Sequence, residues 1–227
     1  MKKIEFRTLT ADEIECRVGT VTDSGCSLLM YKDARVDMRL LDEVVGATNW
    51  KREHEVINGN LFCTVSIWDS SKNEWVSKQD VGVESNTEKE KGQASDAFKR
   101  ACFNWGIGRE LYTCPFVWIK LGANEWRQQT NGRKQPKTRF YVADIQYVDN
   151  KVSYLRIVDE NGTERFVYES KEQLMEALGD AIAEAKSAED MVKLEHIYHK
   201  YQERFGKDKA FLSAVTERKN ILNNKAA

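Results

Sequence analysis

Three histidines are the first residues to consider for catalysis, because a Ser or Cys nucleophile usually needs histidine as its base. His54 falls in a strand-like run, whereas His196 and His199 lie three residues apart in a helical pattern. The sequence has no Gly-x-Ser-x-Gly, Gly-x-Gly-x-x-Gly or Walker-type glycine loop. We therefore expect no catalytic residue, no cofactor and no metal site, and we interpret His196 and His199 as solvated.

Carboxylates provide the enzymatic alternative. A metal-dependent nuclease needs clustered acids and a lysine, because the carboxylates hold the metal ion that activates water. The acids available around the expected sheet are Asp69, Asp80, Glu84, Glu88 and Glu90. Strand and helix faces carry such residues routinely, so a metal-dependent nuclease or DNA-processing enzyme stays the alternative hypothesis.

Basic residues on helix faces are the stronger signal, and the chemistry that they suit is phosphate binding. Arg35 falls in the first turn of an expected helix, where the macrodipole disfavours a cation, so it is either solvated or faces an external anion. Lys99 and Arg100 lie about 140° and 240° around a helical wheel from Ala94. Basic residues interleaved with aromatics are typical of single-strand nucleic-acid grooves, although core packing is the default for each of the six tryptophans.

Two helices and a three-stranded meander must position these cations. Asp33 is expected to cap the first helix, which ends at Gly46. Strands are expected over 50–57, 61–68 and 74–83, the first pair joined by an Asn-Gly hairpin. A capping box at Thr87-x-x-Glu90 opens the second helix, which ends at Gly106 and should pack on the meander. The apolar positions of the two helices are Val36, Leu40, Leu41 and Val44, and Ala94, Ala97, Phe98, Ala101, Cys102 and Trp105.

The remaining pattern adds strands and a helical tail. A capping box at Thr10-x-x-Glu13 predicts a short helix over 11–17. Further strands are expected over 116–121, 140–148, 152–158 and 165–168, and helices follow Ser170. The predicted fold is α+β, with a β-β-β-α core, extra strands and a helical C-terminal tail. We place the core at residues 1–169 and the tail at 170–227.

Charge is unevenly spread along the 227 residues, although the total is close to zero. The sequence has 35 Lys+Arg and 36 Asp+Glu, a net charge of −1. Residues 159–227 carry 14 acidic and 11 basic side chains, a net charge of −3, whereas Lys120 to Arg139 carry six basic and one acidic, a net charge of +5. The near-neutral total therefore conceals a basic strip beside an acidic tail.

Cysteine usage and hydropathy indicate the compartment. The five cysteines are spread out and contain no Cys-x-x-Cys pair, which favours a reducing cytoplasm over a disulfide or zinc scaffold. No apolar run approaches the ~20 residues of a membrane span, and the first ten residues do not resemble a secretory signal. We expect a cytoplasmic protein with no membrane contact.

The order of these pieces resembles the N-terminal annealing domain of the Rad-fifty-two family, including its bacteriophage members. The pattern runs Tyr31-x3-Arg35-x10-Gly46-x3-Trp50, then the meander with Asp80-Val81-Gly82, then Lys91-x7-Lys99-Arg100-Ala101 and Trp105-Gly106. The stretch Ala94 to Ala101 is similar to the family's Ala-x-x-Asp-Gly-Leu-Lys-Arg-Ala helix. The resemblance covers roughly residues 10–115.

The resemblance implies rings or helical filaments with single-stranded DNA in a groove around the oligomer. It places Arg35, Lys99 and Arg100 in the inner DNA site. A family arginine assigned to an outer DNA site appears here as Phe103, and an aromatic after the first-helix glycine appears as Ala47. The lysines that could substitute at the outer site are Lys72, Lys89 and Lys91.

Residues 116–169 have no clear family counterpart. Their basic loop from Arg127 to Arg139, which includes Arg133 and Lys134, is a candidate DNA clamp or assembly element.

The predicted function is ATP-independent binding of single-stranded DNA and annealing of complementary strands in recombination and double-strand-break repair. The expected partners are single-stranded DNA, further copies of the chain in a ring or filament, and a single-strand binding protein at the C-terminal tail. If the protein is phage-encoded, as the resemblance suggests, its location is the bacterial host cytoplasm. A structural assembly protein that reuses the ring-forming fold without DNA is the third hypothesis.

Overall fold

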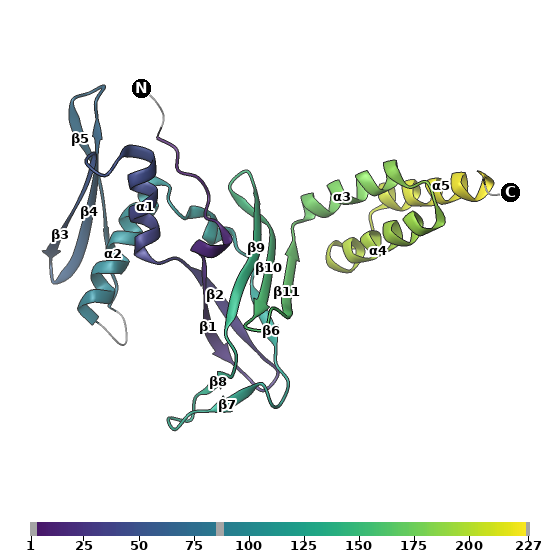
Figure 1. Ribbon diagram of the computed structural model, residues 1–227, viewed down its shortest axis with the longest axis horizontal. Coiled ribbons are helices and arrows are strands. Elements are labelled where there is room, and N and C mark those ends of the chain that lie inside the picture. The colour runs from purple at the N-terminus through teal and green to yellow at the C-terminus, as the bar shows by residue number, and fades with distance from the viewer. Residues whose placement is uncertain (1–3, 85–88, 226–227) are drawn as a thin grey trace. The chain divides into compact units, whose positions relative to one another are not determined.

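The computed structural model describes residues 4–84 and 89–225. The chain forms two compact units, one of Met1–Val152 with Arg156–Phe166, the other of Ser153–Leu155 with Val167–Ala227 (Figure 1). The predicted α+β class is confirmed, with a three-stranded meander packed by a helix and with C-terminal helices. The helix start expected at Thr87 lies outside the described residues, and the boundary at residue 169 stays a prediction.

The N-terminal segment differs from the prediction. The Glu13 carboxylate does accept a hydrogen bond from the Thr10 N–H at 3.0 Å, as in a capping box. The helix that follows is only the three-residue 3-10 helix η1 (Ala11–Glu13). The chain then enters strand β1 (Glu15–Val21), which pairs antiparallel with β2 (Gly25–Tyr31). The helix expected over 11–17 is therefore wrong beyond Glu13, and the hairpin was not predicted.

This hairpin belongs to a six-stranded sheet with the order β11-β10-β9-β1-β2-β6. Its other strands match the predicted runs closely: β6 (Val117–Lys120), β9 (Phe140–Val148), β10 (Lys151–Asp159) and β11 (Glu164–Glu169). Arg165 links the two outermost strands, because its guanidinium donates to the Lys120 carbonyl at 2.9 Å and to Glu125 at 2.7 Å. The short hairpin of β7 (Trp126–Gln128) and β8 (Lys134–Pro136) occupies the predicted basic loop.

The meander forms the second sheet, from β3 (Trp50–Ile57), β4 (Asn60–Asp69) and β5 (Glu74–Val81). Helix α2 (Lys89–Trp105) packs on β4 and β5, as expected. The buried residues of this interface alternate along β4 and follow helical spacing on α2: Cys63, Val65, Ile67, Ala97, Phe98, Ala101 and Cys102. At the end of β5, a Cβ on Gly82 would lie 2.2 Å from the Gln93 carbonyl oxygen, so glycine permits this close approach of strand and helix.

Helix α1 (Ala34–Val45) connects the hairpin to the meander and packs against α2. The predicted cap is confirmed, because Asp33 Oδ1 accepts a hydrogen bond from the Arg35 N–H at 2.8 Å. Gly46 ends the helix with φ 87°, a conformation that glycine adopts readily. Val36, Leu40 and Leu41 are buried as the apolar stripe predicted, whereas Val44 is exposed.

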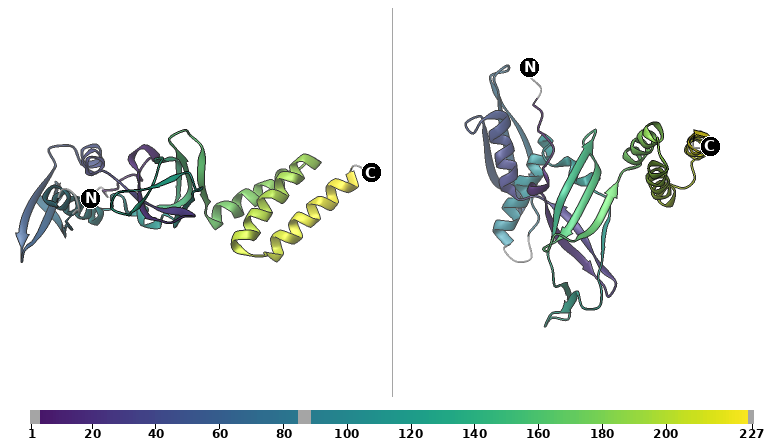
Figure 2. Two further views of the ribbon diagram at one scale, coloured as in Figure 1. Left: turned by 90° about the horizontal axis from the view of Figure 1, so that it is seen from below. Right: turned by 45° about the vertical axis from the view of Figure 1, so that its right-hand side comes forward.

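The second unit is built mainly from α3 (Lys171–Glu184), α4 (Ala188–Phe205) and α5 (Lys209–Lys225), which lie side by side (Figure 2). Ser170 caps α3 by accepting a hydrogen bond from the Gln173 N–H at 3.1 Å. The core of the unit comprises Leu178, Ala185, Met191, Leu194, Tyr198 and Val215. None of the helices in the described part of the chain has the length and apolar content that a membrane crossing needs. All five cysteines are free thiols.

Candidate nucleic-acid interface

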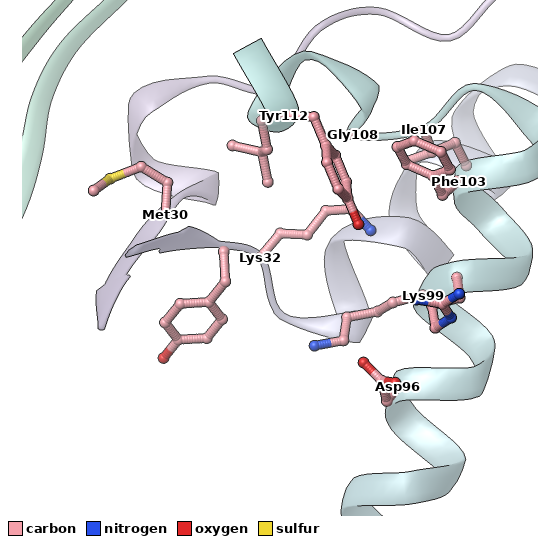
Figure 3. Close-up of a pocket in the computed structure, with 11 residues that line it drawn as sticks. Met30, Lys32, Asp96, Lys99, Phe103, Ile107, Gly108 and Tyr112 are labelled. Carbon is pink, nitrogen blue, oxygen red and sulfur yellow. The ribbon is translucent and has the colours of Figure 1, made fainter. Parts of the chain in front are cut away.

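Helix α2 presents Lys99 and Arg100 outside the buried face that packs on the meander. Successive residues on a helix are 100° apart, so burial of Ala97, Phe98, Ala101 and Cys102 turns the two cations outward. Both line a pocket of about 240 Å³, which we call the α2 pocket (Figure 3). The structure thus brings this predicted pair to one site.

Three chain segments form the α2 pocket. The lining residues come from the end of β2, the middle of α2 and the segment after α2: Met30, Tyr31, Lys32, Asp96, Lys99, Arg100, Phe103, Ile107, Gly108, Leu111 and Tyr112. The volume is below the ~300–1,000 Å³ of pockets that enclose a whole small-molecule ligand. This size suits one phosphate or one base of a polymer better than a complete cofactor.

Lys32 lies under the pocket and is already paired. Its side chain is 7% exposed, and its ammonium donates to Oδ1 of the fully buried Asp37 on α1. The other carboxylate oxygen, Oδ2, has no hydrogen-bond partner among the described residues. Burial raises the pKa of Asp37 to about 6, although the positive charges of Lys32 and Lys99 act in the opposite direction. Lys32 therefore adds almost no net positive charge to the site, because Asp37 compensates its ammonium. Lys99 is near enough for its charge to act on Asp37 as well.

The chain passes Lys32 tightly at Gly108. This glycine has φ 74°, and a Cβ added to it would lie 2.3 Å from Cε of Lys32. Both the positive φ and the contact favour glycine here. The lysine stem thus fills the space that a side chain at position 108 would take.

Arg100 is anchored by an acid on the meander. Its Nε lies 3.2 Å from Oδ1 of Asp80 on β5, and its side chain is still partly exposed. A guanidinium carries five N–H donors in a fixed fork, so this ion pair orients the group and leaves donors for another acceptor. Such an arrangement is suited to bidentate contact with a phosphate.

Arg35 is placed differently from the α2 pair. Its side chain is 85% exposed, and its Nε lies 3.4 Å from Oδ1 of Asp33, the N-cap residue. The predicted conflict with the helix dipole is thus offset locally by a carboxylate at the helix start. Arg35 is not among the residues that line the α2 pocket.

The other predicted cations do not line this pocket either. Lys72 and Lys89 are exposed, with Nζ atoms 3.6 Å from Glu74 and Glu84 respectively. Lys91 is exposed in the first turn of α2.

Arg133 and Lys134 lie on the β7–β8 hairpin and line a separate pocket together with residues of the β1–β2 hairpin. Lys134 pairs with Asp23 in the turn of the β1–β2 hairpin, and its Nζ lies 4.4 Å from the Trp126 ring centroid. These cations form a site separate from the α2 pocket.

The aromatic side of the α2 pocket was not predicted. Phe103 and Tyr112 are in ring contact, with centroids 4.8 Å apart, and Tyr31 contributes a third ring. The sequence marks Phe103 only as a departure from the family pattern. Tyr112 lies in a five-residue 3-10 helix after α2, which is too short for its sequence to show which way a side chain points.

The acids and histidines considered for catalysis are dispersed. In residues 4–84 and 89–225, no three His, Cys, Asp or Glu residues are grouped as they would be around a metal ion. Asp80 pairs with Arg100, and Asp69 accepts hydrogen bonds from Ser71. Glu88 lies outside the described residues. His196 and His199 are exposed on α4, and His54 Nε2 lies 3.1 Å from the Ala94 carbonyl oxygen.

Comparison with known proteins gives a partial likeness. No family model and no solved structure matches the chain. Single-stranded DNA-binding protein DdrA of Deinococcus radiodurans is 33% identical over 112 residues, and the DdrA protein of Deinococcus deserti is 34% identical over 113 residues. Each alignment covers 48% of this chain, and 49% and 55% of the two relatives. The chain therefore spans about half the length of the curated relatives it matches, and over that part it is similar to proteins named for binding single-stranded DNA.

Proposed function

We propose that this protein binds single-stranded DNA through the α2 pocket and anneals complementary strands without ATP, as an oligomer acting in recombination and repair. The observation that carries the proposal is the convergence of Lys99 and Arg100 with three aromatic rings at one pocket. Cations beside aromatics are the combination that single-strand grooves use, because every nucleotide offers a phosphate and a π-face. The likeness to DdrA proteins supports the same ligand class.

The charges at the pocket suggest modest affinity for one protomer. Lys32 is neutralised by Asp37, and the carboxylate of Asp96 stands on the same rim as Lys99 and Arg100. Few net positive charges release few counterions, so a single pocket should bind weakly. Repeated pockets in an oligomer would share one strand and gain effective concentration, which is the physical reason for proposing assembly.

Annealing then requires little of the protein beyond presentation of the bases. Phosphates held by Lys99 and Arg100 keep the strand extended and reduce the repulsion between two strands. Base pairing supplies the specificity, since each correct step contributes on the order of 1.4 kcal/mol of stacking. No nucleotide hydrolysis enters this mechanism.

Fluorescence anisotropy with a labelled oligo(dT) tests the binding step. Lys99→Ala and Arg100→Ala should each weaken binding. Each should also make the negative slope of log association constant against log salt concentration shallower, by about 0.7 for each phosphate that the variant no longer neutralises. Lys193→Ala is a matched control, because this exposed lysine on α4 is in the second unit. Wild-type affinity and salt slope in both α2 variants would refute the site.

The same oligonucleotide also distinguishes the other hypotheses. Incubation with Mg²⁺ should leave it intact, whereas cleavage would support the nuclease. Fluorescence energy transfer between two labelled complementary strands measures annealing. In the absence of ATP, annealing should be fast with the wild type and slow with Lys99→Ala. Negative-stain imaging with and without DNA tests the ring or filament, and salt-insensitive assembly with no DNA bound would favour a structural protein.

A further inference from the structure

Tyr112 is an aromatic side chain that the fold holds in solvent. It is 77% exposed, although a tyrosine ring usually buries much of its apolar area. It belongs to the five-residue 3-10 helix η2 (Arg109–Thr113), which begins directly after Gly108. Its ring contacts that of Phe103, with centroids 4.8 Å apart and an interplanar angle of 59°. A ring that packs on an aromatic neighbour and is still this exposed has free area to contact a ligand.

The backbone that carries Tyr112 is held by side-chain hydrogen bonds. Arg109 ties η2 to the end of α2, since its Nε donates to the Phe103 carbonyl and its Nη2 to the Asn104 carbonyl, each at 2.8 Å. The same guanidinium lies 5.5 Å from the Phe103 ring centroid. Thr113 closes the turn by donating to the Glu110 carbonyl at 2.6 Å. A ring held in this way loses little further conformational entropy when a planar ligand stacks on it.

The ring is part of the same pocket as the two cations. Figure 3 shows Tyr112 and Phe103 at the end of the pocket beyond Lys99, with Asp96 on the opposite side of Lys99 along α2. A strand whose phosphates contact Lys99 and Arg100 would thus have an aromatic surface within its own lining residues. The polar and aromatic halves match the two halves of a nucleotide.

We propose that Tyr112, backed by Phe103, is a stacking platform for one nucleobase of the bound strand. This inference rests on the proposed function and deepens it, because it assigns base contact to a site otherwise argued from phosphate contact alone. Stacking on a tyrosine tolerates every base, so the platform adds affinity without sequence preference. It also spaces the strand, since one base per protomer is fixed while its neighbours remain available for pairing.

Oligonucleotides that differ only in their bases test the platform. The probes are oligo(dT) and an oligomer of equal length made of abasic residues, which carries the same phosphates. Wild type should bind oligo(dT) more tightly by at least roughly fivefold, the lower end of one base–aromatic stack. Tyr112→Ala should lose most of that preference and keep its affinity for the abasic strand, whereas Tyr112→Phe should retain the preference.

Phe116→Ala provides the matched control. Phe116 is also an exposed aromatic of the first unit, 75% exposed and in ring contact with Trp118, but it does not line the α2 pocket. This variant should keep the preference for oligo(dT).

Each failure has a distinct meaning. If wild type binds neither probe, the proposed function is wrong. If wild type binds both equally, or Tyr112→Ala keeps the preference, only the platform is refuted. Equal weakening of both probes by Tyr112→Ala together with a smaller assembly in light scattering would also refute it, because Tyr112 would then be a contact between subunits.

Discussion

Replacement of Lys32 by methionine should destabilise the first unit strongly at neutral pH. The ammonium of Lys32 is the counter-charge of Asp37, which is fully buried, and the second carboxylate oxygen of Asp37 has no hydrogen-bond partner among the described residues. Methionine retains a long unbranched chain to fill the space beside Gly108. Removing Lys32 leaves the Asp37 charge uncompensated, and the folded protein relieves this by protonating the carboxyl group. Because each pH unit above the wild-type pKa of about 6 costs about 1.4 kcal/mol in that case, we expect a loss of about 2 kcal/mol at pH 7.5.

The loss should shrink in acid. Burial already raises the pKa of Asp37 from 3.8 to about 6, and Lys32 is the main group that lowers it. In the wild type the folded carboxyl binds its proton more tightly than the unfolded one, so this group's contribution to stability falls as pH rises from 3.8 to about 6. Without Lys32 the folded pKa is higher still, and the fall continues to higher pH. The difference between variant and wild type should therefore be small at pH 5 and large at pH 7.5.

Tryptophan fluorescence during urea unfolding measures this difference in the relevant unit. All six tryptophans lie between residues 50 and 126, within the first unit, so the signal excludes the helical unit. The double variant Lys32→Met with Asp37→Leu should recover most of the stability, because no buried charge remains. Lys72→Met, at an exposed lysine, should change little. An equal loss at both pH values, or a double variant no more stable than Lys32→Met, would refute this account of the pair.

Three other outcomes are expected. Arg35→Ala should leave the free energy of unfolding within about 0.5 kcal/mol of wild type, since the side chain is exposed, and anisotropy should show weaker DNA binding. Lower stability with unchanged DNA affinity would assign Arg35 a structural role. Glu13→Gln should weaken the loss of stability in acid, because hydrogen bonds from Arg7 lower the pKa of Glu13 to about 2. The stability that ionised Glu13 contributes is present above its ordinary pKa of 4.5 and is lost as pH falls towards 2, so an unchanged acid dependence in urea titrations would contradict this. Gly82→Ala should destabilise the first unit by more than about 1 kcal/mol, because the new Cβ meets the Gln93 carbonyl, whereas Gly179→Ala in α3 has open space around it and should stabilise its helix by about 0.5–1 kcal/mol. Circular dichroism melts should therefore shift in opposite directions for the two variants.

The regular elements could be predicted because their local signals agree. In α2 the apolar spacing fixes the buried face, and that face in turn leaves Lys99 and Arg100 outward. The meander was equally clear, since Asn58-Gly59 sets the first turn and the buried apolar residues of β4 fall on alternate positions, at Cys63, Val65 and Ile67. Here propensity, turn chemistry and periodicity favour one structure.

The β1–β2 hairpin lacked such agreement. Its register shifts between Val18 and Val21, so the alternation of the strand is broken. Gly19 stands within the strand, where a Cβ would lie 2.7 Å from Ser27 Oγ, and glycine normally argues against a strand. The capping box at Thr10 then favoured a helix that tertiary pairing with β2 and β9 replaces.

The site was predictable only in part, for a related reason. Its two cations share one helix, but Lys32 and Tyr112 come from segments about 80 residues apart. Neither the salt bridge to Asp37 nor the contact of Tyr112 with Phe103 leaves a local pattern in the sequence. Packing of the segment before α1 against α2 and Gly108 brings Lys32 to the same pocket as Tyr112.

The close passage of Lys32 over Gly108 has a consequence for sequence change. Any side chain at position 108 would displace the lysine stem, and displacement would strand the buried carboxylate of Asp37. A single substitution at position 32, 37 or 108 therefore destabilises the fold as long as the other two residues are unchanged. Among related sequences, positions 32, 37 and 108 should be retained together or replaced together, and homologues without the glycine should also lack the buried acid.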